Sequence, residues 1–282
     1  MAEYIKVPAG VYDMVTRCME QEFPDHVAIR YVAEDGKTVV EKKYREYAQD
    51  IRRMVAYLKA EVPDIKGQRI VLLSRNCYEF CVASYGIILA GGVLVTLNQK
   101  KTWEELEYEL GLVEPALILN DGIDYGCRAE LEAAYGPKLR PMDCYKDTAP
   151  GELTSCVGHD DLMMLMFTSG TTGRSKGVML SEKNYFTAIK MYIDGQKVMP
   201  EVAPKDMNQL FSHFTLVPMF HLSGFICYFA YGIQGWTLNL CADPRDLRRD
   251  MSMMHSDAMS TPPVLVAVSY THLRAHETLS DL

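Results

Sequence analysis

A leader sequence and long apolar runs are the first features missing from this chain. The opening residues, MAEYIKVPAG, include acidic Glu3 and no apolar run, so the sequence predicts no secretory signal peptide. The longest apolar stretches, 85–97 and 214–233, are short or interrupted by glycine, proline and histidine, and neither supplies the roughly 20 apolar residues of a transmembrane helix. We therefore expect a cytoplasmic protein without a transmembrane segment. Peripheral contact with a membrane stays compatible with the sequence.

An excess of basic residues is also missing. Lysine and arginine total 29 against 37 aspartates and glutamates, which gives a net charge of −8. Nucleic-acid-binding proteins usually show the opposite balance, so we expect no nucleic-acid partner. The eight cysteines include no C-x-x-C pair. This spacing argues against a zinc site or a disulfide framework and favours buried free thiols in a reducing compartment, so we assign no metal ligands.

The composition is that of an ordinary globular protein. The chain has 282 residues, of which 48% are hydrophobic and 23% charged, enough for one large domain or two smaller ones. Helical and strand-like segments alternate, which favours an α/β fold. We expect two consecutive open α/β subdomains, at 10–155 and 156–268, with a polar surface connection across 120–160.

Local periodicity, turn residues and caps predict the individual elements. A hairpin of strands 27–32 and 38–41 turns at Asp35-Gly36, a favoured turn pair. Thr102, followed by acidic residues in the next turn, marks a helix start. The alternation of strand and helix between 70 and 119 predicts a parallel sheet with right-handed crossovers. The other predicted elements are helices at 44–61, 78–90, 102–112, 183–198 and 243–255, and strands at 70–73, 93–97, 116–119, 162–167, 215–217, 236–241 and 258–260.

A glycine- and hydroxyl-rich loop at 168–177 carries the clearest chemical signal. The segment TSGTTGRSKG follows an apolar strand and contains three glycines, five hydroxyl side chains and two cations. Glycines let backbone N–H groups approach an anion, hydroxyls donate further hydrogen bonds, and Lys176 adds a point charge. The pattern indicates a phosphate cradle; a flexible surface loop is the alternative. A Walker A loop requires G-x-x-x-x-G-K-[ST], and this spacing does not fit because Ser175 precedes Lys176 and no glycine lies five positions before Gly173.

The same segment, TSGTTGRSKGV, closely resembles the phosphate-loop signature of the adenylate-forming superfamily, [YF]-T-S-G-[ST]-T-G-x-P-K-G-V. That family includes acyl-CoA synthetases, luciferases and the adenylation domains of peptide synthetases. Further similar segments occur in the expected order: PDHVAI, KYREYAQDIRRMVAYL, NCYEFCVASYGIILAGGVLVTLNQKKTWEELEYEL, TLVPMFHLSGF and MSTPPVLV. One position departs from the signature, because Ser175 stands where the family has proline.

The resemblance implies an AMP-forming acid–thiol ligase of the acyl-CoA synthetase type. Such an enzyme joins ATP and a small-molecule carboxylic acid into an acyl-adenylate and then transfers the acyl group to a thiol, usually coenzyme A. Mg²⁺ is implied because it neutralises the triphosphate. The residues implied to contact the phosphates are Thr168, Ser169, Thr171, Thr172 and Lys176, with Gly170 and Gly173 giving the loop its shape.

His221, in the segment PMFHLSGF, matches the family histidine beside the acyl-adenylate pocket. Its neighbours Phe220, Leu222, Phe225, Tyr228 and Phe229 are apolar, as an acyl pocket requires. The resemblance implies a catalytic role for His221. A packed residue at the start of the next helix is the alternative.

Three features of the family are not found in the sequence. There is no Y-G-x-[ST]-E segment, no T-G-D triplet, and no C-terminal domain with its catalytic lysine. The resemblance ends near residue 268, and residues 269–282 look like translated adaptor sequence. We therefore expect an N-terminal fragment that does not complete adenylation. Two alternatives stay open: a short, non-catalytic nucleotide-binding or interaction module, and an adenylation domain that loads a carrier protein.

Overall fold

The computed structural model describes residues 7–155, 158–168, 174–198 and 211–260, and for 196–198 the backbone alone. The helical elements are α1 (Val11–Asp13), η1 (Met14–Glu22), α2 (Tyr44–Glu61), α3 (Tyr78–Ala90), α4 (Trp103–Val113), α5 (Arg128–Tyr135), η2 (Gly136–Lys138), α6 (Glu182–Val198), α7 (Leu222–Gln234), η3 (Pro244–Asp246) and α8 (Leu247–Met254). The strands are β1 (Val27–Val32), β2 (Val39–Lys43), β3 (Arg69–Leu73), β4 (Val93–Thr96), β5 (Leu117–Asn120), β6 (Leu139–Pro141), β7 (Leu162–Thr168), β8 (Lys176–Ser181), β9 (Ser212–Thr215), β10 (Thr237–Leu240) and β11 (Ala258–Ser260).

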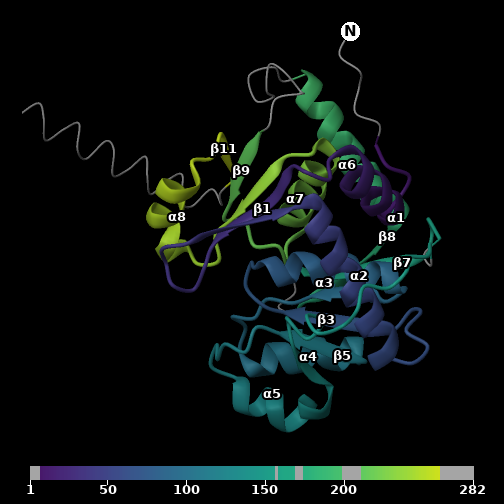
Figure 1. Cartoon of the computed structure of the whole chain (residues 1–282). Coiled ribbons are helices and arrows are strands. Elements are labelled where there is room, and N and C mark those ends of the chain that lie inside the picture. The colour runs from purple at the N-terminus through teal and green to yellow at the C-terminus, as the bar shows by residue number, and fades with distance from the viewer. Residues whose placement is uncertain (1–6, 156–157, 169–173, 199–210, 261–282) are drawn as a thin grey trace, which may run out of the picture.

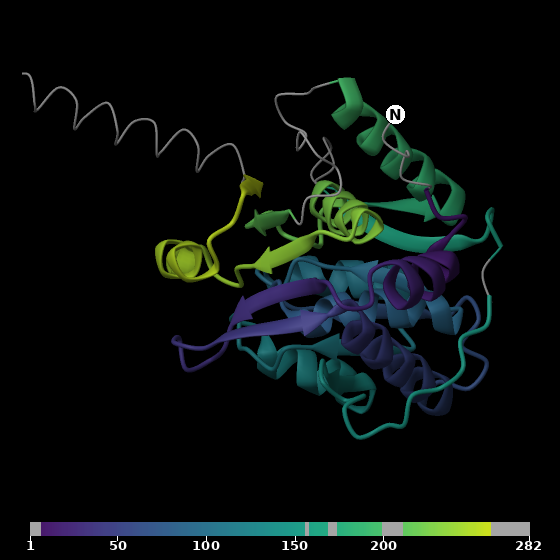
Figure 2. The same cartoon turned by 45° about the horizontal axis from the view of Figure 1, so that its top comes forward.

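The strands form two sheets stacked with helices between and outside them (Figure 1). Sheet A has the order β11-β9-β10-β1-β2, and sheet B has the order β6-β5-β3-β4-β7-β8. A central hydrophobic core lies between the sheets and includes residues of α2, α3, α6 and α7. Smaller clusters cover the outer faces: α4 and α5 pack on sheet B, and α8 packs on sheet A. Figure 2 shows the same layers from a second direction. This arrangement confirms the predicted α/β class.

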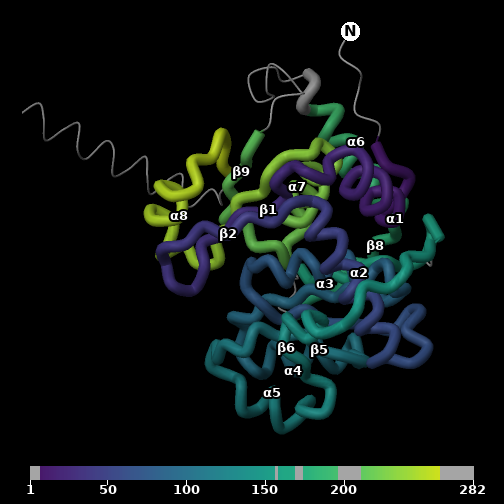
Figure 3. Tube along the Cα trace, viewed as in Figure 1, coloured from purple at the N-terminus to yellow at the C-terminus, as the bar shows by residue number. Residues whose placement is uncertain are grey.

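Both sheets draw strands from each side of residue 155. In sheet A, β1 pairs in parallel with β10, with Ile29 opposite Leu238. In sheet B, β4 pairs in parallel with β7, with Leu94 opposite Met164. In Figure 3, which traces the chain by colour, the purple β1–β2 hairpin lies against the later strands. The two α/β units are therefore interleaved along the sequence, and the sheets themselves do not separate at residue 155.

Helix α3 shows how the layering follows from the sequence. Twelve of its thirteen residues are buried, and Glu79 is the exception. A helix that is apolar on every side is stable only where it is covered on every side, and α3 lies in the central layer between the sheets. Its left-handed C-cap, with a φ of 94°, is supplied by Gly91. The predicted bounds of 78–90 are confirmed.

The connection across 120–160 differs from the prediction. It contains α5, β6 and the fully buried Tyr145, so it is not simply a polar surface link. Strand β8 follows the glycine-rich loop and was not predicted, and β9 lies at 212–215 rather than 215–217. Among the described residues, no helix has the length and apolar character needed to cross a membrane.

Candidate functional site

The glycine-rich loop connects the two strands of an antiparallel hairpin. Strands β7 and β8 pair up to Thr168 and Lys176, which face each other as the last pair before the loop. The Thr168 hydroxyl donates to the Lys176 carbonyl oxygen at 3.5 Å. Lys176 is exposed, and within the described ranges its ammonium makes no hydrogen bond or ion pair. The sheet thus presents Lys176 at the base of the loop with its charge available.

The five other residues implied to hold phosphate, Ser169, Gly170, Thr171, Thr172 and Gly173, lie outside the described residues. Their role remains a prediction. The structure does describe the next two residues; α4 contacts the first, and Lys101, which precedes α4, contacts the second. The Arg174 guanidinium lies 5.1 Å from the centre of the Tyr108 ring, a cation–π contact. Ser175 accepts a hydrogen bond from the Lys101 ammonium at 3.2 Å.

Lys101 is held in place by a buried carboxylate. Its ammonium forms an ion pair with Glu109, whose side chain is fully buried, while 19% of the Lys101 side chain is exposed. Lys101 immediately precedes Thr102, the N-cap of α4, and Glu109 lies two turns into that helix. The side chain therefore spans from the interior of α4 to the flank of the loop. Neither residue was identified from the sequence.

His221 occupies the N-cap position of α7. Its N–H donates to the Pro218 carbonyl at 3.1 Å, and its own carbonyl accepts from the Phe225 N–H at 3.1 Å. The ring lies against Phe220, with 4.5 Å between ring centres. Partial burial lowers the pKa of His221, and the positive charge of Lys101 lowers it further. His221 and the loop flank are thus within the electrostatic reach of the same lysine.

Two residues, one just after β3 and one at the end of β4, fix the segment that leads to His221. Asn76, just after β3, donates from Nδ2 to the Val217 carbonyl at 3.0 Å and accepts from the Met219 N–H at 2.9 Å. Thr96, at the end of β4, donates to the Phe220 carbonyl at 3.2 Å. Side-chain bonds to an irregular backbone replace the hydrogen bonds that a strand or helix would have supplied.

The aromatic residues after His221 are placed differently from the prediction. Phe225 and Phe229 are fully buried and Tyr228 is 5% exposed, and all three belong to the central core. Phe229 stacks on Tyr85 of α3, with 4.3 Å between ring centres. These side chains join α7 to α3 instead of lining an open pocket, because the helical spacing turns them toward the central layer. Of the predicted set, Leu222 is 39% exposed.

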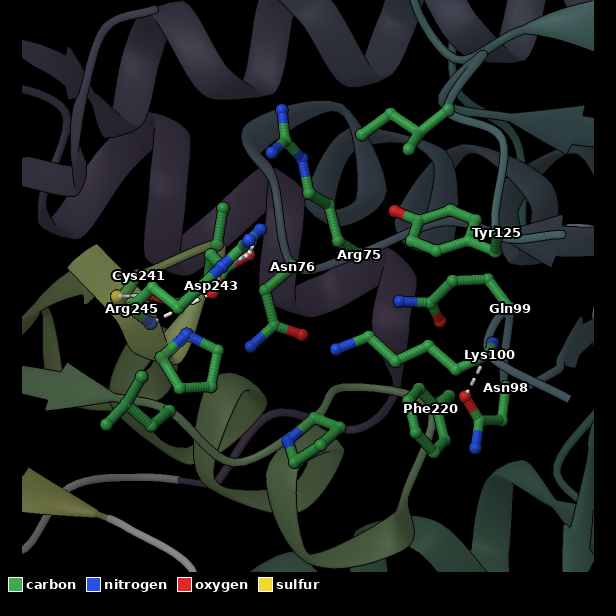
Figure 4. A pocket seen from close by; sticks show the side chains of 15 residues that line it. Arg75, Asn76, Asn98, Gln99, Lys100, Tyr125, Phe220, Cys241, Asp243 and Arg245 are labelled. Atoms are coloured by element: carbon green, nitrogen blue, oxygen red, sulfur yellow. Dashed lines mark hydrogen bonds and ion pairs between the residues drawn. The ribbon is translucent and has the colours of Figure 1, made fainter. Parts of the chain in front are cut away.

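A cavity of about 240 Å³ lies where the carboxyl ends of β3, β4 and β5 meet the segments after β9 and β10. Gln99 and Lys100 extend into it from the segment after β4 (Figure 4). Gln99 is 4% exposed, and its Oε1 has no hydrogen-bond partner in the described part of the chain. On the opposite side, Arg245 and Asp243 form an ion pair at 2.6 Å.

The charges around this cavity act on one another. The pKa of Asp243 is lowered to about 2, mainly by hydrogen bonds from Arg245, and Lys100 contributes a further lowering. The polar lining also includes Arg75, Asn76, Asn98 and Tyr125. The sequence carried one signal for this site, because carboxyl ends of neighbouring parallel strands form the usual ligand-binding edge of an α/β sheet. The residues that line the cavity were nevertheless not predicted from the sequence.

The two sheets, their helices and the glycine-rich hairpin define the N-terminal domain of adenylate-forming enzymes. The chain aligns with o-succinylbenzoate CoA synthetase (MenE) from Bacillus subtilis in complex with the acyl-adenylate intermediate OSB-AMP at a TM-score of 0.74 and 22% identity, over 92% of this chain and 50% of that one. It aligns equally with the inhibitor-bound N-terminal domain of FACL13 from Mycobacterium tuberculosis, at a TM-score of 0.74 and 20% identity, over 92% and 64% of the two chains.

The chain belongs to the AMP-binding enzyme family, whose profile matches residues 17–280. This match continues past residue 268, where the sequence analysis placed the end of the resemblance. A curated long-chain-fatty-acid–CoA ligase from Bacillus subtilis is 23% identical over 75% of this chain and 42% of its own length. A 2-succinylbenzoate–CoA ligase from Bacillus velezensis is 28% identical over 68% and 37%. The chain thus spans less than half the length of these curated relatives.

Proposed function

We propose that the chain supplies the phosphate-binding part of an AMP-forming acid–thiol ligase. In the first half-reaction, a carboxylate oxygen bonds to the α-phosphorus of ATP and the bond to the pyrophosphate oxygen breaks. In the second, a thiol sulfur attacks the acyl carbon and AMP leaves. Negative charge develops on the departing pyrophosphate, so electrostatic stabilisation near the β- and γ-phosphates accelerates the first step.

The observation that carries this proposal is the position of Lys176. The hairpin holds it opposite Thr168 at the base of the loop, exposed and without a partner among the described side chains. An ammonium in that position offers a charge to a phosphate without first breaking an ion pair. The described residues contain no group of three potential metal ligands. We accordingly propose that Mg²⁺ arrives bound to the triphosphate.

His221 fits a second role in this proposal. Its depressed pKa keeps the imidazole neutral at pH 7, so one ring nitrogen can accept and the other donate a hydrogen bond. A neutral ring beside the acyl-adenylate can orient the substrate carboxylate without forming an ion pair with it. We propose a small-molecule carboxylic acid as the substrate and leave its acyl group unassigned, because the aromatic residues after His221 are part of the core.

We further propose coenzyme A as the thiol acceptor. The cavity after β3, β4 and β5 presents Lys100 and Arg75, which suit the phosphates of that cofactor, and the amide oxygen of Gln99 is available for an N–H or O–H donor. A carrier protein would bring a single phosphate on its arm. Titration of the chain with coenzyme A and with phosphopantetheine separates the two: equal affinities would remove the argument for the larger acceptor.

Tripolyphosphate and Mg²⁺–ATP binding, measured by calorimetry on the 282-residue chain, tests the phosphate site. Replacement of Lys176 by alanine removes a charge-assisted hydrogen bond and should weaken binding about 10-fold or more, while Lys176→Arg should retain part of it. Lys190→Ala, which removes an exposed lysine paired with Asp194 on α6, is the matched control. Undiminished binding by Lys176→Ala would reject the phosphate role.

The chain contains neither the Y-G-x-[ST]-E nor the T-G-D segment of the family. For this reason we propose that it binds the nucleotide without completing adenylation. Carboxylate-dependent exchange of pyrophosphate into ATP is the corresponding measurement. Robust exchange by the purified chain would contradict this part of the proposal and leave the phosphate site intact.

A further inference from the structure

A buried ion pair lies beside the proposed phosphate site, and neither of its residues was assigned a role from the sequence. Lys101, just before the N-cap of α4, pairs with Glu109 within that helix, and the Glu109 side chain is fully buried. Glu109 uses one carboxylate oxygen for this pair. Its Oε2 has no hydrogen-bond partner among the described residues.

Such a pair is a poor source of stability. Burial of two charges carries a desolvation cost that their attraction offsets only when the remaining hydrogen-bonding positions are also satisfied. The unpartnered Oε2 leaves that condition unmet. The pair does impose a geometry, because Glu109 draws the ammonium of Lys101 inward while the neighbouring Lys100 extends into the cavity of Figure 4.

Among the loop residues that the structure describes, the constrained ammonium contacts Ser175. Lys101 Nζ donates to Ser175 Oγ at 3.2 Å. Ser175 stands where the family signature has proline, a residue that stiffens the backbone and cannot accept this bond. Arg174 is held beside it by the Tyr108 ring. The two successive residues immediately before Lys176 are therefore held in place, one by Tyr108 of α4 and the other by Lys101 just before that helix.

We propose that Lys101 is a positioning residue for the phosphate site: anchored by Glu109, it holds Ser175 and so determines where Lys176 presents its ammonium. This inference rests on the proposed function. In this chain, a hydrogen bond from Lys101 does the work that proline stiffness does in the signature. The same lysine charge also contributes to keeping His221 neutral.

Rescue by proline is the test. Tripolyphosphate affinity is measured by calorimetry for the wild-type chain, Ser175→Ala, Ser175→Pro, and the double replacement Lys101→Met with Glu109→Leu, which removes both charges together and leaves no buried carboxylate unpaired. Loss of one hydrogen bond that orders the site should weaken binding about 3- to 10-fold in Ser175→Ala and in the double replacement. Ser175→Pro should bind within about 2-fold of wild type, since proline restores the stiffness.

The combination of Ser175→Pro with the double replacement decides between a positioning role and a direct charge. A positioning role predicts no further loss, because the proline chain no longer depends on Lys101. An equal loss in the serine and proline backgrounds would overturn the inference. Removal of the exposed Arg128–Glu132 pair of α5, by Arg128→Met with Glu132→Leu, is the matched control and should leave binding unchanged. Circular dichroism checks that each variant is folded.

The outcomes separate this inference from the proposed function. If Lys176→Ala binds as tightly as wild type, or wild type does not bind, the phosphate site itself is rejected. If Lys176→Ala is weakened and Ser175→Ala is not, the phosphate site stands and the positioning role of Lys101 is rejected.

Discussion

Asn76 binds the backbone on both sides of Pro218, and its closer bond is to Met219, whose N–H donates to Oδ1 at 2.9 Å. The amide of the same side chain donates to the Val217 carbonyl at 3.0 Å. Asn76 follows a strand of sheet B, whereas the segment it holds follows a strand of sheet A. One asparagine therefore connects the two sheets at the point where the chain turns toward His221.

Replacement of Asn76 by alanine should destabilise the fold by roughly 2–4 kcal/mol. A buried N–H and a partly buried carbonyl would lose their partners, and each unsatisfied buried group costs about 1–3 kcal/mol. Urea unfolding followed by tryptophan fluorescence measures the change. Asn98→Ala, which removes one exposed bond to the Lys100 N–H, is the matched control and should cost less than about 1 kcal/mol. Equal costs for the two variants would argue against the linking role of Asn76.

Gly224→Ala should move the segment before His221. A Cβ at this position would lie 2.6 Å from the Pro218 carbonyl oxygen, so the backbone has to shift. We expect a loss of about 1–3 kcal/mol, typical of overpacking, and altered NMR shifts at His221. Gly111→Ala in α4 has no atom within 4 Å of the new Cβ and should stabilise the chain by up to about 1 kcal/mol. A neutral Gly224→Ala would show that the helix start has room.

Stability should fall as the pH drops below that of neutral solution, and His213 should be one cause. Burial lowers its pKa from 6.5 to about 4, so the folded state keeps the ring neutral where the unfolded state binds a proton. Above pH 6.5 the ring is neutral in both states and stability is unaffected. Between pH 6.5 and 4 the free energy of unfolding should fall progressively, to a limit of about 3 kcal/mol.

The His213 contribution is measured from urea unfolding at several pH values, compared with His213→Gln. The variant should show a shallower loss of stability across the same pH range. An unchanged pH dependence would assign the effect to other groups. His213 Nε2 also lies 2.7 Å from Ser260 Oγ. When both ring nitrogens carry a proton, Nε2 can only donate this hydrogen bond, so protonation fixes its direction.

The thiols that the structure describes should react slowly with iodoacetamide while the chain is folded. Cys77 and Cys144 are only partly buried at the residue level, yet burial of the sulfur raises the pKa of each to about 11. Thiolate is the reactive form, so little is present near pH 8. Mass spectrometry with and without urea, on a Cys156→Ser chain, makes the comparison. Rapid native labelling of Cys77 or Cys144 would contradict these pKa values.

Elements with strong local signals were predictable. The Thr102–Glu105 capping box that begins α4 is present, with reciprocal bonds between the two residues. The β1–β2 hairpin turns at Asp35 and Gly36 as expected, and Gly36 has a φ of 66°. In each case a few neighbouring residues determine the backbone conformation, so no distant contact was needed for the prediction.

Elements that depend on distant partners were missed or displaced. Strand β9 consists of Ser-His-Phe-Thr, a sequence without an apolar run, and becomes a strand because β10 and β11 pair on either side of it. The apolar residues just after it look more like a strand, but Asn76 binds the backbone of Val217. Side-chain bonds from another sheet cannot be read from local periodicity.

The candidate site likewise contains residues that were predictable from local sequence and residues that were not. Thr168 and Lys176 were identified from the sequence, and the hairpin pairs them. Lys101 and Glu109 were not, because a lysine and a glutamate eight positions apart on a charged segment are typical of a solvated helix face. Glu109 is buried and paired with Lys101, which donates to Ser175 on the loop flank, and only the three-dimensional arrangement reveals these contacts.

Because the sheets are interleaved along the sequence, strands that pair in the folded protein leave the ribosome at very different times. Ile29 belongs to a hairpin that emerges early, but its parallel partner Leu238 is translated about 200 residues later. One edge of β1 therefore remains without its native neighbour during most of translation. Contacts of such long sequence separation slow folding and raise the contact order of the whole domain. We therefore expect chaperones to bind the nascent β1–β2 hairpin, whose exposed strand edge has no native partner until β10 is synthesised.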